Sequence, residues 1–414
     1  MCRDRTMPPS LPAPLQVLVQ SVVPFLVLLV FGYSDYAIGY RLGYKEIFQH
    51  HTHGAAITLW VLLGFSQTIT FYYWLQVYIK GPGKSPVFPA FDLYANIETL
   101  PEYFMCDENG YPYWCTTCQS LKVPRSFHSR RTGYCILKFD HYCIWLGSSL
   151  GVSNYIYFFK LAVWFVVMII IALVFLIVYT KPNRDRGSHS IDGNFIAMYV
   201  VGGFWFIMAG GLVVSHIWYV LRGTTTMDDL SVKQQKRYLR WQQAKQAGKA
   251  GSRASPRQEN GKRYINLRHQ DGSRIVVQYS LKDRPYSFSP GCNWIHTFLN
   301  GNSYVYNDTL PETNYSLLRL TTAIAVSFVP FAELGFKPKT KPIDRTSAAE
   351  HYNDYNEAIS PSFCKLIESK ISAGDFTVAA HYRAFAEAEA KTVSERDTSD
   401  TAGDSTSDKV QVQG

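Results

Sequence analysis

The chain has 414 residues, an excess of nine positive charges and 47% hydrophobic residues. Length alone would allow two or three soluble domains, but the apolar residues gather in long runs before about residue 221, and the rest of the chain is polar. The positive charge suits a protein that lies against anionic lipid or binds an anionic ligand. Nucleic-acid binding is disfavoured, because the aromatic residues lie in the apolar runs rather than between basic residues.

Two apolar segments follow a short N-terminus (1–14), whose Cys2 could be lipidated, although a lone N-terminal cysteine is more often incidental. Residues 15–33 hold no charge and are about long enough to cross a bilayer. No convincing cleavage site follows them, so a retained span is favoured over a signal peptide. After a short polar loop (34–54), residues 55–79 form a second uncharged run. We therefore expect transmembrane helices 1 and 2 within 15–79.

Two further apolar runs follow a soluble segment, residues 80–154. The third run, about 155–179, has Lys160 as its only charge, and the fourth, about 195–221, contains His216, which we expect to pack against a neighbouring helix. Four spans (the last two within 155–221) place the N-terminus, the 80–154 segment and the tail on one side. That side is richer in Lys and Arg, so the positive-inside rule predicts that it is cytosolic.

The C-terminal region divides into two parts. Residues 222–340 start with a basic, Gln-rich solvated helix, and their apolar part (276–340) should fold back onto the membrane domain or its cytosolic face. Residues 341–414 are rich in Ser, Thr, Asp, Glu and Ala, and we expect a largely disordered tail. No internal repeat is evident.

The cysteines of the 80–154 segment have the spacing of metal ligands. Cys115-x2-Cys118 is suited to hold one ion from a single turn, and His128 and Cys135 could close a Cys3His site, which zinc prefers in structural roles. The pattern does not resemble a disulfide framework, which indicates a reducing compartment. Reduced core cysteines or a redox-active pair are the alternatives.

Asp140-His141-Tyr142-Cys143 brings together an acid, an imidazole and a thiol. A thiol is only a few per cent thiolate at neutral pH, so a cysteine nucleophile needs a base nearby. His141 can supply that base, and Asp140 can hold its imidazole in one tautomer. The spacing leaves open that His141 and Cys143 are further zinc ligands.

This stretch resembles the cysteine-rich domain of the DHHC protein S-acyltransferases, the membrane palmitoyltransferases, over about residues 80–160. The resemblance implies an α-helical polytopic membrane protein with four transmembrane helices and the cysteine-rich domain in the cytosolic loop between the second and third. Thr225-Thr226-Met227-Asp228 is similar to the family's Thr-Thr-x-Glu, and SFSPGCNWIHTFLNGN is more loosely similar to its C-terminal element. The DHYC variant, with CDENGYPYWC before it, resembles a fungal subgroup.

The resemblance also implies two sets of zinc ligands, of which only one is present. The present set is Cys115, Cys118, His128 and Cys135. The positions of the other set hold Ser129, Thr132, Tyr142 and Ser149. Because all four ligands are missing together, we predict one structural zinc and interpret Tyr142 as a packing or hydrogen-bonding substitute. His141 and Cys143 keep the reactive positions.

The resemblance implies two-step acyl transfer, with palmitoyl-CoA as the expected donor. Cys143 would attack the thioester with His141 as base and Asp140 orienting it, and a protein thiol would then take the acyl group. The acyl chain would lie between the spans. The candidates to meet the CoA phosphates are Lys122, Arg125, Arg130, Arg131 and Lys138; the alternative for these charges is a solvated or lipid-facing surface.

Two other function classes remain: a catalytically inert, zinc-stabilised membrane scaffold, which the missing ligands favour, and a transporter or channel, which the scarcity of polar groups in the spans disfavours. The expected partners are fatty acyl-CoA, proteins with membrane-proximal cysteines and the lipid bilayer, but not nucleic acid. We expect a multi-pass protein of a eukaryotic endomembrane or plasma membrane, with both termini and the cysteine-rich domain in the cytosol.

Overall fold

The computed structural model describes residues 13–94, 100–185, 191–246, 262–299, 315–335 and 352–384. Cys2, which could be lipidated but is more often incidental, and the last twenty residues, for which we predict disorder, lie outside these ranges. The chain forms two compact units, and each is built from three segments. Unit 1 is Met1–Ser85, Arg125–Leu230 and Tyr286–Lys341, and unit 2 is Pro86–Pro124, Ser231–Pro285 and Pro342–Gly414. The segment 80–154, which we predicted as one domain, is thus shared between both units.

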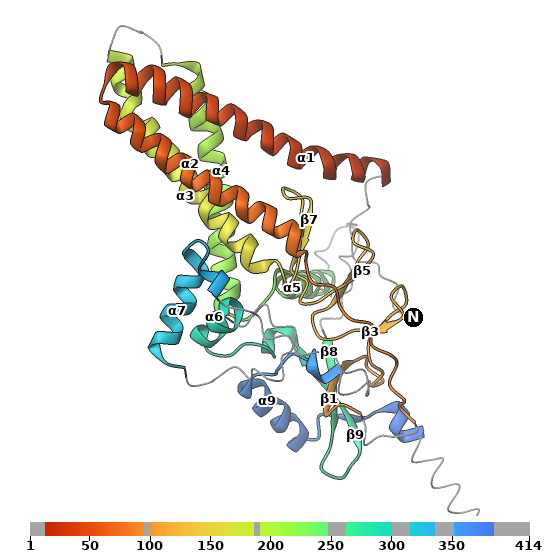
Figure 1. The fold of residues 1–414 in the computed structure, drawn as a ribbon. Helices are drawn as coiled ribbons and strands as arrows, with labels where there is room; N and C mark the ends of the chain where they lie inside the picture. The colour runs from red at the N-terminus through yellow and green to blue at the C-terminus, as the bar shows by residue number, and fades with distance from the viewer. Residues whose placement is uncertain are drawn as a thin grey trace, which may run out of the picture. The chain divides into compact units, whose positions relative to one another are not determined.

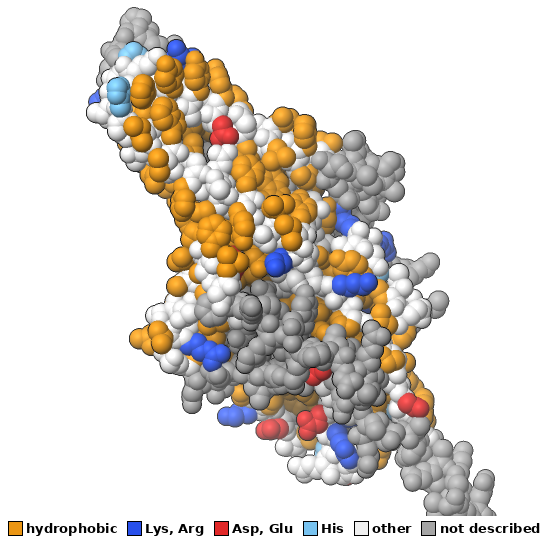
Figure 2. Space-filling view, viewed as in Figure 1, with side chains coloured by type: hydrophobic (Ala, Val, Ile, Leu, Met, Phe, Trp, Pro, Cys, Tyr) orange, Lys and Arg blue, Asp and Glu red, His pale blue; other side chains and the backbone are white. Residues whose placement is uncertain are grey.

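Unit 1 contains four helices that are long and apolar enough to cross a membrane. They are α1 (Ala13–Ser34) continued by the π-helix η1 (Asp35–Phe48), α2 (His53–Lys80), α3 (Tyr155–Asp185) and α4 (Gly193–Leu221). Helix α3 packs against both α2 and α4 (Figure 1). Apolar side chains cover much of the visible surface of these helices (Figure 2), as a protein with lipid around it requires. The prediction of a four-span α-helical membrane protein is confirmed.

The first span differs from the predicted one, because residues 35–48 are helical rather than a polar loop. Tyr36, Tyr40, Tyr44 and Phe48 stack at four-residue spacing along one side of η1, while apolar residues such as Leu42 and Ile47 are buried on the other. Scattered charges concealed this amphipathic pattern. One of them, Arg41, pairs with Asp192 before α4 at 2.5 Å.

Three short antiparallel hairpins follow α2 in the sequence. The first, in unit 2, pairs β2 (Trp114–Cys115) with β3 (Ser120–Leu121). The other two belong to unit 1: β4 (Phe127–Ser129) with β5 (Tyr134–Ile136), and β6 (His141–Cys143) with β7 (Ser148–Leu150). Asn154 fixes the third hairpin to the spans, because its side chain donates to the carbonyls of Val77 and Ser149 and accepts from the N–H of Gly151.

The later part of unit 1 folds back onto its spans, as the sequence predicts. Helix α5 (Thr226–Gln246) follows α4, but only its first residues, up to Leu230, belong to unit 1. Unit 1 continues with α6 (Pro290–Leu299), α7 (Leu317–Phe328) and the 3₁₀ turn η4 (Ala332–Gly335). Asn293 donates to the carbonyl of Leu221 at the end of α4. Trp164 of α3 donates to the carbonyl of Phe328. Lys160, buried in α3, is ion-paired with Glu333 of η4.

Unit 2 has a sheet of four antiparallel strands in the order β1-β8-β9-β10. These are β1 (Tyr103–Cys106), β8 (Lys262–Arg268), β9 (Arg274–Ser280) and β10 (Thr377–Val378), with the 3₁₀ turn η3 (Leu281–Asp283) and helix α9 (Pro361–Ser372) beside them. Phe363 of α9 is buried and contacts the ring of Tyr279. The range 341–414, which we expected to be largely disordered, therefore contributes a helix and a strand to a folded core.

Candidate functional site

An acid, an imidazole and a thiol lie next to one another at the start of the β6–β7 hairpin. The Nδ1 atom of His141 lies 2.7 Å from Oδ2 of Asp140, and a hydrogen bond to Cys143 engages the imidazole as well. Because alternate residues of a strand face the same way, His141 and Cys143 are neighbours on β6. The carboxylate of the preceding residue then holds the ring from its other nitrogen.

Asp140 is buried, but it is fully supplied with donors. Thr226, the first residue of α5, donates to this carboxylate through both its backbone N–H and its hydroxyl, each at 2.8 Å. Burial alone would raise the pKa of Asp140, but the hydrogen bond and charge of His141 and the N–H of Thr226 lower this pKa to about 2. Asp140 is therefore an anion at any physiological pH.

His141 has a pKa shifted in the opposite direction. Burial alone would lower it, but the hydrogen bonds to Asp140 and Cys143 and their negative charges raise the pKa of His141 to about 9. An imidazole whose pKa is raised in this way can hold a proton at neutral pH.

Asp228, the last residue of the Thr-Thr-Met-Asp motif, joins the motif to the rest of unit 1. Asp228 accepts from the N–H of Thr225 and pairs with Arg125 at 3.4 Å. Arg125 also donates to the carbonyl of Gly223 and stacks on the ring of Tyr286. Asp228 thus makes these contacts at the position where the family motif has the longer Glu.

His216 of α4 also belongs to this cluster. Its donor atoms and those of Asp140 and His141 lie within 4.8 Å of one another, and its Nδ1 is 3.0 Å from the hydroxyl of Tyr155. The sequence suggested only that His216 packs against a helix. Its place beside the acid–base pair could not be predicted, because 75 residues of sequence separate it from His141.

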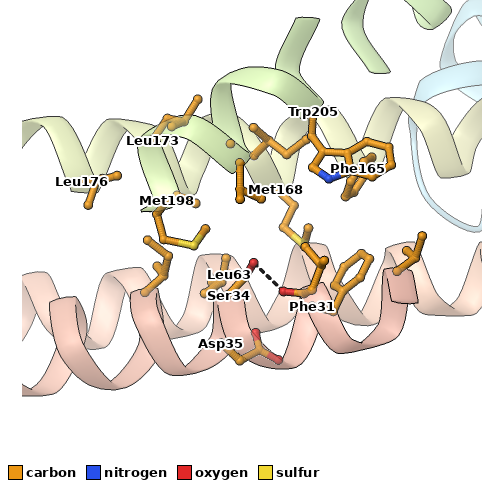
Figure 3. A pocket seen from close by; sticks show the side chains of 17 residues that line it. Phe31, Ser34, Asp35, Leu63, Phe165, Met168, Leu173, Leu176, Met198 and Trp205 are labelled. Carbon is orange, nitrogen blue, oxygen red and sulfur yellow. Dashed lines mark hydrogen bonds between the residues drawn. The ribbon is translucent and has the colours of Figure 1, made fainter. Parts of the chain in front are cut away.

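Cys143 faces apolar surroundings. It is 8% exposed and lines an apolar pocket, together with residues of all four spanning helices, among them Phe31, Trp74, Phe158 and Trp205. A second apolar pocket shares Val27, Phe31, Phe165 and Trp205 with the first. Figure 3 shows the side chains of this second pocket, which come from α1, η1, α2, α3 and α4.

The two pockets follow one another along the helices. On α3, residues of the first pocket begin at Phe158 and those of the second end at Leu176. That stretch measures ~27 Å at a rise of 1.5 Å per residue. Together the pockets line the space between the spans with apolar residues, starting at Cys143. Their combined length along α3 approaches the thickness of the hydrocarbon core of a bilayer.

The predicted zinc ligands lie as two pairs, one in each unit. In unit 2, Cys115 and Cys118 share the β2–β3 turn, where the N–H of Cys118 donates to Sγ of Cys115 at 3.4 Å. In unit 1, His128 and Cys135 are directly opposite each other on β4 and β5. The three thiols and one imidazole of these two pairs are donors that suit zinc.

The five cations proposed for CoA differ in their surroundings. Arg130 and Arg131 are exposed in the β4–β5 turn, and Lys122 and Lys138 are half-buried. The side chain of Arg131 lies over the ring of Tyr142, 3.6 Å from its centroid. Arg125 is held by Asp228, Gly223 and Tyr286, as described above, so its guanidinium serves the fold.

Comparison with known proteins agrees with this geometry. A family model described as DHHC palmitoyltransferase matches residues 108–233. A protein named Palmitoyltransferase PFA5 from Candida albicans is 37% identical over 377 residues, which cover 87% of this chain and 92% of that protein. The chain belongs to the DHHC palmitoyltransferase family. Other relatives match a smaller part: Palmitoyltransferase PFA5 of Saccharomyces cerevisiae is 27% identical over 52% of this chain and 64% of its own length, and Palmitoyltransferase ZDHHC5-B of Danio rerio is 31% identical over 29% of this chain.

This DHHC protein is accordingly a protein S-acyltransferase, and the scaffold alternative is not favoured. The acid–base pair and the thiol are all present and in contact, so the missing ligand set has not removed the reactive groups.

Proposed function

We propose that Cys143 carries the acyl group from a long-chain acyl-CoA to thiols of target proteins, with His141 moving the proton and Asp140 positioning His141. The observation that carries this proposal is the placement of Cys143 between two unlike environments. The Asp140–His141 pair lies on one side of it, and an apolar pocket formed by four spanning helices lies on the other.

The first step forms an acyl-enzyme. His141 takes the proton of the Cys143 thiol, and the sulfur attacks the carbonyl carbon of the thioester. The new carbon–sulfur bond to Cys143 forms as the bond to the CoA sulfur breaks, and His141 returns its proton to the leaving CoA thiolate. The acyl chain occupies the two connected pockets, and a palmitoyl chain fits this apolar depth.

The second step repeats this chemistry with a protein thiol as nucleophile. The target cysteine gives its proton to His141 and attacks the acyl-enzyme, and Cys143 leaves and is reprotonated by His141. The apolar pocket excludes water from the acyl chain, which favours transfer over hydrolysis. A target cysteine must reach the end of the spans, so we propose membrane-proximal cysteines as substrates.

For the phosphates of CoA we propose Arg130 and Lys138, with Lys122 as a further candidate. Arg130 is exposed, and Lys138 lines a hollow beside Asp140. Arginine and lysine are the usual phosphate partners. Zinc, when bound by the two ligand pairs, would supply structural closure and no reactive group. The excess of Lys and Arg on the side of the reactive centre supports a cytosolic orientation.

The test is acylation of the purified full-length protein in detergent with labelled palmitoyl-CoA. We expect label on the chain that hydroxylamine releases, and no such label on Cys143→Ser. Cys292→Ser is the matched control, since Cys292 is also buried but lies on α6, and it should be labelled like the wild type. Equal label on Cys143→Ser would place the acyl group elsewhere and overturn the proposal.

A further inference from the structure

The three hairpins that follow α2 repeat one conformation every 14 residues. The residue pair that closes each turn is Cys115 with Ser120, Ser129 with Tyr134, and Cys143 with Ser148. Each turn also ends on a residue with a left-handed backbone: Gln119 (φ 52°), Gly133 (φ 76°) and Gly147 (φ 67°). The sequence does not reveal this repeat, because few side chains are shared between the copies.

The second turn has the same internal hydrogen bond as the metal-ligand turn. In the first turn the N–H of Cys118 donates to Sγ of Cys115 at 3.4 Å. In the second turn the N–H of Thr132 donates to Oγ of Ser129, also at 3.4 Å. Ser129-x2-Thr132 is therefore a Cys-x2-Cys turn with oxygen in place of sulfur.

The same 14-residue step relates the whole ligand set to a second set in unit 1. Positions 14 residues after Cys115, Cys118, His128 and Cys135 hold Ser129, Thr132, Tyr142 and Ser149. The members of the second set lie together: Tyr142 is opposite Ser149 on β6 and β7, and the hydroxyls of Ser129 and Ser149 are 3.5 Å apart. The hydroxyls of Thr132 and Tyr142 are buried.

This second set does not suit zinc. Three aliphatic hydroxyls and a phenol are poor zinc ligands compared with thiolates and imidazole. Another interaction holds this corner instead, since the guanidinium of Arg131, from the same turn as Ser129, stacks on the ring of Tyr142. A guanidinium over the face of an aromatic ring is attracted to it electrostatically.

We propose that the β4–β5 turn and the β6–β7 hairpin are joined by a metal-free clamp, consisting of Ser129, Thr132, Ser149 and the Arg131–Tyr142 stack, that positions Cys143. This inference rests on the proposed role of Cys143. Tyr142 lies directly between His141 and Cys143 on β6, so fixing its ring fixes the strand from which both reactive side chains project. Arg131 is thereby a positioning residue rather than a phosphate contact.

Zinc content tests the clamp without any measurement of activity. The full-length Cys143→Ala protein, in which the nucleophile cannot act as a ligand, should contain one zinc per chain by mass spectrometry of the metal; two would overturn the proposal. Adding Ser129→Cys, Thr132→Cys, Tyr142→His and Ser149→Cys to this protein should raise the content to two. One zinc in a monodisperse quadruple variant would contradict the 14-residue relation.

Single substitutions test the clamp where the quadruple variant does not fold. Arg131→Gln should increase hydrogen exchange of the β6–β7 amides ~3- to 5-fold, as expected for losing a partly exposed cation–π contact, while Arg130→Gln leaves that exchange unchanged. In the acylation assay, Arg131→Gln should lower kcat and leave KM for palmitoyl-CoA unaltered. A higher KM with unchanged exchange would assign Arg131 to CoA and overturn the clamp. If the wild type forms no acyl-enzyme, the proposed function fails, but the zinc and exchange results still decide the clamp.

Discussion

The side of the reactive centre that holds Asp140 contrasts with the side that holds Cys143. The carboxylate of Asp140 has directional hydrogen-bond partners, two donors from Thr226 and one ring nitrogen from His141. Around Cys143 the lining is apolar, and its shape comes from four helices. The polar side controls where a proton lies, and the apolar side controls which chain enters and whether water follows it. Substitutions on the two sides should therefore change different measurements.

The largest effect is expected from Asp140→Asn. This change keeps the shape of the side chain but removes the charge that raises the pKa of His141 and fixes its tautomer. We expect acyl-enzyme formation to fall by about 10²- to 10⁴-fold, and alkylation of Cys143 by iodoacetamide at neutral pH to slow as well. Rates within threefold of the wild type for both reactions would show that the carboxylate has no part in the chemistry.

Thr226→Val should produce a smaller loss on the same side. It removes the hydroxyl donor to Asp140 but keeps the backbone N–H. A hydrogen bond to a charged group contributes about 1.5–3 kcal/mol, so acyl-enzyme formation should slow ~10- to 100-fold with KM unchanged. Thr224→Val is the control, because it changes the same motif region two residues earlier, where the N–H of Thr224 donates to the carbonyl of Tyr219, and it should act like the wild type.

On the apolar side, Ala172→Phe should change selectivity rather than rate. Ala172 lines the second pocket but not the pocket at Cys143. Filling that space should shift the preference from 18-carbon toward 14-carbon acyl-CoA by about tenfold, measured by competition between the two donors. Val178→Phe, on the exposed side of the same helix, should leave the preference unchanged; an unchanged preference in Ala172→Phe would exclude the second pocket from acyl binding.

The smallest effect concerns pH and stability. The pKa of His141 is raised from its ordinary value near 6.5 to about 9, so its contribution to stability is complete below pH ~6.5 and is lost as the pH rises through 9. The melting temperature of the wild type in detergent should therefore drop by a few degrees more than that of His141→Gln between pH 7 and 10. Parallel curves for the two proteins would contradict the raised pKa.

Local sequence signals predicted four spans, although not the helical residues 35–48, and they marked the ligand pairs and the Asp-His-x-Cys group as candidate sites. A long apolar run without charges predicts a span, and closely spaced cysteines and histidines predict a metal site. Both patterns can be recognised within a short stretch of sequence. The folded part of the polar tail could not be predicted in this way. Thr377 pairs with Val276 of β9, and no local pattern predicts a two-residue strand whose partner lies 101 residues away. The hydrogen bond from Thr226 to Asp140 also joins residues far apart in the sequence, 86 positions, although the Thr-Thr-x-Asp motif marked Thr226 as a residue to examine.

The pair formed by Lys160 and Glu333 has a consequence for how the protein is made. During synthesis, Lys160 enters the membrane while its partner is still 173 residues from being translated. A lysine inside a span is unfavourable until it is paired. Chains that stop before residue 333 lack the carboxylate that pairs with Lys160, so we expect truncation there to destabilise the third helix.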